Sequence, residues 1–167
     1  YVPNGSSIES DKFNYKKKWI RTLKRYLEKY LLKQSPICLL GDFNIAPEDR
    51  DIYNPKRYIE KVMASKIERE LLKSVLGESL EDVFRIFEPE KNHWTWWDYR
   101  HSAWEKDYGW RIDHIYITEE ILSRTNSCWI DKKPRSNFKP SDHTPVIVDL
   151  NWPPIEEEEN ELIFEEF

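Results

Sequence analysis

The stretch Ile37-Cys38-Leu39-Leu40-Gly41-Asp42-Phe43-Asn44 is an apolar run followed directly by a polar turn. An apolar run bounded by Pro36 and Gly41 predicts a buried strand. Because alternate residues of a strand share a face, Asp42 and Asn44 would present two oxygen-bearing side chains at its end. Hard divalent cations such as Mg²⁺ prefer such ligands. The alternative is that both residues only cap and turn the chain.

Two later stretches have the same form, with an acid beside an apolar strand. They are Arg111-Ile112-Asp113-His114 and Pro140-Ser141-Asp142-His143. Carboxylates that gather at strand ends repel one another unless a cation or a proton lies between them. A divalent metal there would polarise a phosphoryl oxygen, and an Asp could activate the attacking water. The alternatives are an ion pair between Asp113 and Arg111, and a role for His143 as a cap on the last strand.

The composition is that of a globular domain, with 14% aromatic and 34% charged residues in a chain of 167. No apolar run is long enough to cross a bilayer, so we expect no membrane partner. Cys38 and Cys128 lie in apolar segments, and we interpret them as reduced core residues of a cytoplasmic protein. The net charge of −5 is concentrated at the end of the chain, where residues 155–167 hold seven Glu and no base. We interpret 153–167 as a solvated acidic tail.

Apolar spacing predicts two amphipathic helices, at about 16–33 and 59–76. Ser10 or Asp11 can cap the first helix, and Gly77 would end the second. The basic run 16–18 is interpreted as the solvated face of the first helix. His93 and His114 lack a ligand spacing, and we expect them to be structural. The predicted strands cover 37–40, 94–97, 110–118, 126–130 and 144–150, and 80–87 is a short helical or extended piece. This mixture predicts an α/β protein with layers around a sheet.

Aromatic and basic residues lie close to the acidic motifs. Because adjacent strand residues point to opposite faces, one of Trp96 and Trp97 is expected to be buried while its neighbour is exposed. An exposed Trp suits stacking on a base or sugar, although core packing is the commoner role. The positive charges that could contact phosphates are Arg100, Arg111, Lys132, Lys133, Arg135 and Lys139.

Taken in order, these segments resemble the exonuclease III family of apurinic/apyrimidinic endonucleases, within the endonuclease/exonuclease/phosphatase superfamily. The resemblance runs from Tyr1 to about Trp152. The matching stretches are Tyr1-Val2-Pro3-Asn4-Gly5, Leu40-Gly41-Asp42-Phe43-Asn44-Ile45-Ala46-Pro47, Asp51-Ile52-Tyr53-Asn54-Pro55, Thr95-Trp96-Trp97-Asp98-Tyr99-Arg100, Gly109-Trp110-Arg111-Ile112-Asp113-His114 and Lys139-Pro140-Ser141-Asp142-His143-Thr144-Pro145-Val146. The resemblance implies a four-layered α/β sandwich. It also implies a DNA-repair hydrolase that acts on double-stranded DNA, as an endonuclease beside abasic sites and as an exonuclease and phosphodiesterase at 3′ ends.

The resemblance also implies roles for single residues. Tyr1 would contact the scissile phosphate, Asp42 would position or deprotonate the water, and Asn44 would stabilise the transition state. Asp113 would orient His143, which would contact the phosphate. The implied ligands of Mg²⁺, or alternatively Mn²⁺, are Asp42, Asn44, Asp142 and His143. The implied DNA-binding residues are Trp96 in the abasic pocket, with Arg100, Arg111 and Lys139.

In that family the domain begins with a segment that carries an Asn and a Glu for the principal Mg²⁺, and this sequence starts after the corresponding point. We therefore expect residues 1–152 to be the C-terminal part of a single nuclease domain. We expect this part to be inactive or nearly so by itself, and the complete protein to be a monomer. Two alternatives are another phosphodiesterase of the superfamily, and a non-catalytic fragment that binds DNA or needs a separate N-terminal chain.

Overall fold

Two small sheets form the centre of the molecule, for which a computed structural model describes residues 1–90 and 92–151. β1 (Cys38–Asp42), β3 (Asp113–Ile117) and β2 (Glu81–Asp82) make an antiparallel sheet in the order β1-β3-β2. β4 (Thr125–Ile130) and β5 (Val146–Leu150) pair antiparallel in the second sheet. The predicted tail 153–167 lies outside the described residues.

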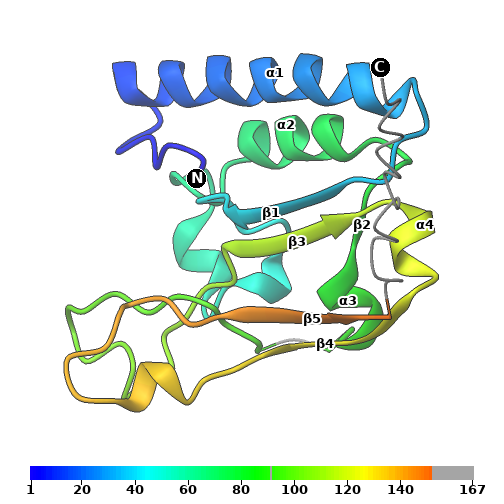
Figure 1. Cartoon of the computed structure of the whole chain (residues 1–167). Coiled ribbons are helices and arrows are strands. Elements are labelled where there is room, and N and C mark those ends of the chain that lie inside the picture. Colours follow the sequence, from blue (N-terminus) through cyan, green and yellow to red (C-terminus); the bar gives the residue numbers. More distant parts are fainter. Residues whose placement is uncertain (91, 152–167) are drawn as a thin grey trace, which may run out of the picture.

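Two amphipathic helices cover one face of the three-stranded sheet, and the two-stranded sheet lies toward the other (Figure 1). α1 (Asp11–Leu31) begins after Ser10, whose side chain accepts a hydrogen bond from the N–H of Phe13. α2 (Lys66–Leu76) begins with a reciprocal capping box between Ser65 and Glu68 and ends at Gly77, which has a φ of 56°. The result is an α/β arrangement of a helix layer on two sheets, as predicted.

Shorter elements connect these layers. Two short helices, α3 (Val83–Phe87) and α4 (Glu119–Leu122), follow β2 and β3. Three 3₁₀ turns lie in the longer connections: η1 (Asp49–Asp51), η2 (Pro55–Tyr58) and η3 (Pro134–Ser136). No helix in the described ranges is both long and apolar enough to span a bilayer.

β3 contributes to a core on each of its faces. Tyr116 points to the helix side, where it is packed with Ile20 of α1 and Leu72 of α2. Ile115 and Ile117 point to the opposite side, where they are packed with residues from α3, β4 and β5. Burial on both faces is the reason that the strand is apolar from Ile115 to Ile117, and the alternation fixes which face its first residue, Asp113, presents.

Two predictions about the elements need correction, whereas the predicted cap of the first helix is confirmed by Ser10, which precedes the first helical residue Asp11. The second helix begins at Lys66 rather than near residue 59, because Glu60 and Met63 take left-handed backbone conformations with φ of 53° and 71°. The predicted strand at 94–97 is not a strand, since Trp96 forms only isolated backbone bridges.

Three predictions about burial also differ from the structure. Lys16 is fully buried and does not belong to a solvated face. Leu40 is 62% exposed and Cys38 is exposed, because β1 has one face covered by the helices and the other open. Cys128 is buried as predicted, and neither cysteine forms a disulfide.

Candidate active site

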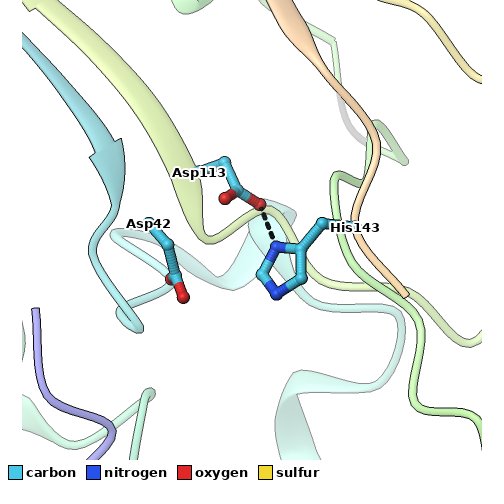
Figure 2. A group of neighbouring side chains, drawn as sticks. All are labelled: Asp42, Asp113 and His143. Atoms are coloured by element: carbon cyan, nitrogen blue, oxygen red, sulfur yellow. Dashed lines mark hydrogen bonds and ion pairs between the residues drawn. The ribbon is translucent and has the colours of Figure 1, made fainter. Parts of the chain in front are cut away.

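Three polar chain segments meet at one end of the three-stranded sheet. The register of β1 on β3 places Asp42 directly opposite Asp113. The segment before β5 runs beside the Trp-rich loop, where Trp97 N donates to Asp142 O at 3.0 Å and a backbone bridge joins Trp96 to His143. His143 is thereby held over the strand ends that carry the two carboxylates (Figure 2).

His143 and Asp113 form a hydrogen-bonded pair, with 2.8 Å between Nδ1 and Oδ2. Asp113 therefore pairs with His143 and not with Arg111, the alternative considered above. The buried hydroxyl of Thr95 accepts hydrogen bonds from the backbone N–H groups of Ile112 and Asp113, both at 3.1 Å, and fixes the start of β3. Burial lowers the pKa of His143, but the hydrogen bond and charge of Asp113 outweigh it and raise that pKa. The pair thus favours a cationic imidazole.

Asp42 and Asn44 form a compact turn. The backbone N–H of Asn44 donates to Asp42 Oδ1 at 2.8 Å, and its side-chain Nδ2 donates to Asp42 Oδ2 at 2.9 Å and to Val2 O at 3.0 Å. Asn4 Nδ2 donates to Asn44 Oδ1 at 2.9 Å. Burial raises the pKa of Asp42, and the charge of Asp113 adds to this while the hydrogen bond from Asn44 N opposes it. The turn therefore holds both a carboxylate and an amide in fixed orientations.

One group of residues in the described part of the chain has the geometry of a metal site. Asp42, Asp113 and His143 each offer a ligand atom, and these atoms lie within 4.8 Å of one another. Oxygen ligands with one imidazole fit Mg²⁺ or Mn²⁺. Of the predicted ligands, Asp42 and His143 belong to this group. Asp142 Oδ2 instead accepts a hydrogen bond from Trp96 Nε1 at 2.9 Å, and the amide of Asn44 is directed at Asp42.

An open cavity of about 830 Å³ lies beside this group. It is lined by seven of the predicted site residues: Tyr1, Asp42, Asn44, Trp96, Arg100, Asp142 and His143. The rest of its wall is mainly aromatic and basic: Tyr53, Tyr58, Tyr108, Trp110, Arg57, Lys61 and Lys106. Aromatic faces beside positive charges suit a sugar–phosphate chain with bases attached.

The two tryptophans differ in burial, as predicted, although residues 94–97 are not a strand and the less buried one is not fully exposed. Trp97 is fully buried, whereas Trp96 is half-buried and lines the cavity. Arg100 is exposed and forms an ion pair with Asp98 at 2.6 Å. Lys139 is exposed on the loop before Asp142 but does not line the cavity.

Arg111 corrects the prediction of a DNA contact. Its side chain is 1% exposed and forms ion pairs with Asp51 and Asp82, both at 2.7 Å. It also donates to Nδ1 of buried His114 at 3.0 Å, while the other ring nitrogen of His114 lies 2.9 Å from Ile45 O. A guanidinium enclosed in this way cannot reach a phosphate. Its role is to join η1, β2 and β3 beneath the site.

Sequence reasoning assigned no role to several residues of the site. Asn4 belongs to the stretch 1–5 that resembles the family. Its position, as a polar residue directly after a predicted strand end, was the only local sign that it belongs to the site. Thr95 belongs to the stretch 95–100 that also resembles the family, but the hydrogen bonds that its hydroxyl accepts from Ile112 N and Asp113 N are visible only in the fold. Tyr53 and Tyr108 stack at 4.4 Å although they come from separate loops, and no local pattern indicates that contact.

Comparison with known proteins agrees with this geometry. Residues 5–143 match the model of the endonuclease/exonuclease/phosphatase family. The chain belongs to this family. Among curated members it is 36% identical over 158 residues to exodeoxyribonuclease III of Haemophilus influenzae, covering 90% of this chain and 59% of that protein. It is 32% identical over 155 residues to a DNA-(apurinic or apyrimidinic site) endonuclease of Dictyostelium discoideum, covering 90% of this chain and 42% of that one.

Solved structures of family members share the fold. A 3′-5′ exonuclease from Neisseria meningitidis has a TM-score of 0.87 and 36% identity, over 91% of this chain and 59% of that one. An AP endonuclease from Archaeoglobus fulgidus has a TM-score of 0.86 and 36% identity, over 91% of this chain and 60% of that one. The two are thus matched over most of this chain. The chain spans less than two thirds of the length of each of these relatives.

Proposed function

We propose that the protein is a Mg²⁺-dependent DNA-repair nuclease that hydrolyses phosphodiester bonds of double-stranded DNA at abasic sites and at 3′ ends, with Mn²⁺ as an alternative metal. The observation that carries this proposal is the Asp113–His143 pair beside Asp42 at an aromatic and basic cavity. The names of the relatives support DNA as the substrate class. Its cytoplasmic location and its monomeric state stay predictions.

The residues of the site suit hydrolysis by water. Asp42 accepts a proton from the water as its oxygen attacks phosphorus, and the bond from phosphorus to the leaving oxygen breaks. The Asp113-bound imidazole of His143 donates to a phosphate oxygen, where negative charge develops. A metal held by Asp42, with Asn44 and Asp142 as further ligands, would polarise the phosphoryl group. His143 was also predicted as a ligand, but a ring nitrogen that donates to the phosphate cannot ligate the metal at the same time.

Other residues of the cavity place the substrate. Asn44 supports the transition state by holding Asp42 in place, since its side-chain N–H groups donate to Asp42 Oδ2 and to Val2 O. Tyr1, which is 76% exposed at the cavity, contacts the phosphate. Trp96 presents an aromatic face whose indole N–H is already directed at Asp142, so a sugar can lie against the ring without competing for that hydrogen bond. Arg100 and Lys139 bind flanking phosphates.

The decisive experiment uses the complete protein and compares His143→Ala with the unsubstituted sequence on abasic duplex DNA and on 3′ ends. We expect cleavage to fall about 10²–10³-fold, because loss of a group that stabilises transition-state charge has effects of that size. Binding of uncleaved DNA should change much less. His93→Ala, which changes the same residue type away from the cavity, is the matched control. Normal cleavage by His143→Ala would overturn the mechanism.

The substrate class needs a separate experiment. The complete protein is assayed on abasic duplex DNA, inositol phosphates and sphingomyelin under identical conditions with Mg²⁺. We expect turnover only of DNA. Preferred turnover of either other substrate would assign the protein to another phosphodiesterase branch of the family, and DNA binding without any turnover would favour a non-catalytic role for this chain.

A further inference from the structure

A buried ion pair lies beneath the candidate active site. The side chains of Lys16 and Glu68 are both 0% exposed, and 2.5 Å separates Nζ from Oε1. Lys16 belongs to α1 and Glu68 to the first turn of α2, so the pair joins the two helices. Moving two charges out of water carries a large desolvation penalty, which a pair of this kind often does no more than offset. Its contribution to stability is therefore a weak explanation for its presence.

The ammonium group of Lys16 also binds the two backbone segments that carry the asparagines of the site. Nζ donates to Asn44 O at 2.7 Å and to Asn4 O at 3.1 Å. An ammonium has three N–H donors, and Glu68 takes the third. Asn4 and Asn44 both line the cavity, and their side chains bond to each other. Lys16 thus holds both asparagines from behind without reaching the cavity.

Glu68 extends the network to a third segment of the cavity wall. Besides Lys16, its carboxylate accepts hydrogen bonds from Met63 N at 3.0 Å, from Ser65 N at 3.2 Å and from Ser65 Oγ at 2.5 Å. Met63 lines the cavity, and its sulfur accepts from Asn4 Nδ2 at 3.4 Å. The carboxylate is therefore fully satisfied, and it connects the α2 cap to the same asparagine.

The segments tied by this network have backbone conformations that need support. Asn44 and Met63 have φ of 49° and 71°, in the left-handed region that residues other than glycine seldom occupy. Such conformations persist where the surrounding structure holds them. Gly5, with φ of 96°, lies against the Lys16 side chain so closely that an added Cβ would meet its Cδ at 3.2 Å.

We propose that Lys16 and Glu68 are positioning residues, which hold the Asp42–Asn44 turn in the orientation that the reaction needs. Asn44 is fixed by Lys16 through its carbonyl, and Asn44 in turn donates to both oxygens of Asp42. The catalytic consequence rests on the proposed nuclease function. A misplacement of about 1 Å at a reacting group can lower the rate about 10²-fold.

The test replaces both charges together, in Lys16→Met/Glu68→Gln of the complete protein. Methionine keeps most of the lysine volume, and glutamine keeps an acceptor for the α2 cap, so no unpaired charge is left buried. We expect kcat on abasic DNA to fall about 10- to 100-fold, with KM and the affinity for uncleaved DNA little changed. The matched control is Lys24→Met/Glu28→Gln, an exposed pair of the same composition on α1, which should leave kcat unchanged.

A second readout needs no substrate. NMR follows the exchange of the Asn44 side-chain amide protons with solvent, and we expect faster exchange in the double variant but not in the control. A folded double variant with wild-type kcat, or with slow Asn44 exchange, overturns the proposal. If the double variant does not fold, the same two measurements, kcat and Asn44 side-chain amide exchange, are made on Glu68→Gln alone, and the same outcomes overturn the proposal. If the complete protein without substitutions cleaves no DNA, the nuclease function fails, and the exchange measurement still decides whether Lys16 holds the turn.

Discussion

Nδ1 of His143 lies 2.8 Å from Oδ2 of Asp113, although the two residues are 30 positions apart in the sequence. The contact uses one ring nitrogen and leaves the other for a substrate, as in sites where an acid orients a histidine. It also joins the segment before β5 to the first residue of β3. The orientation of the imidazole thus depends on the correct packing of the two sheets.

Replacing the acid of this pair tests its electrostatic effect. In Asp113→Asn the side chain keeps its shape but loses its charge, so we expect the pKa of His143 to fall, because that charge raises it in the wild-type protein. NMR titration of the His143 ring in metal-free buffer measures the change. Asp149→Asn, at an exposed position of β5, is the control and should leave His143 unchanged. If the pKa of His143 is the same in Asp113→Asn as in the wild-type protein, Asp113 orients the imidazole without an electrostatic effect on its protonation.

Arg111 should matter for stability rather than for DNA binding. In Arg111→Met the carboxylates of Asp51 and Asp82 lose their buried partner, so we expect the free energy of unfolding to fall by about 3–5 kcal/mol. Urea denaturation measures the loss. Arg100→Met should change stability by less than about 0.5 kcal/mol, because Arg100 is exposed, and should weaken DNA binding instead. If Arg111→Met instead weakens DNA binding and leaves stability unchanged, Arg111 contacts DNA as the sequence predicted.

Gly109 is required by the tryptophan packed against it. A Cβ at this position would lie 2.3 Å from Cγ of Trp94, which is buried. We expect Gly109→Ala to destabilise the fold by about 1–3 kcal/mol through overpacking. Thermal unfolding measures the loss. A melting temperature equal to wild type would mean that the loop has room to move.

His114 should make stability depend on pH. Burial, aided by the charge of Arg111, lowers the pKa of His114 to about 4. The unfolded chain has a histidine pKa of about 6.5, so it binds a proton at a pH where the folded protein does not. Stability is therefore complete above about pH 6.5 and falls as the pH drops toward 4, by on the order of 3 kcal/mol in total.

Urea titrations at a series of pH values measure this dependence. In His114→Gln the part of the slope between about pH 6.5 and 4 should disappear, because glutamine does not titrate in that range. If His114→Gln loses stability in acid as the wild-type protein does, groups other than His114 cause the loss. Asp51 would act only at lower pH, because Arg111 and Arg85 hold its pKa at about 2 against the effect of its burial.

The local sequence was sufficient to find the strand ends. Asp42 and Asp113 each follow or begin an apolar run, and that pattern alone placed them at the edge of a sheet. The pattern could not place Lys16 or Arg111 inside the protein, because each is buried by partners distant in sequence. Lys16 stands 52 positions from Glu68, and Arg111 stands 60 from Asp51. From local sequence alone, a charged residue is predicted to be solvent-exposed unless its oppositely charged partner in the fold is known.

The start of the second helix was also predicted incorrectly from the local sequence pattern. Its apolar spacing extends back to Ile59, and periodicity alone therefore predicted a start there. The actual start is set by the capping box of Ser65 and Glu68. Its signature, a serine three residues before a glutamate, is visible in the sequence and was outweighed by the apolar pattern.

The division of the site between two sheets has a consequence for how the chain acquires its properties during folding. Asp42 and Asp113 meet when β1 pairs with β3, whereas His143 arrives with the segment leading into β5. Contacts between distant parts of a chain form slowly, since loop closure opposes them. We expect His143 to reach the carboxylates only after the two sheets have docked. Intermediates with helices and one sheet already formed would then lack the complete set of candidate site residues, and the proposed nuclease activity would emerge only with the native state.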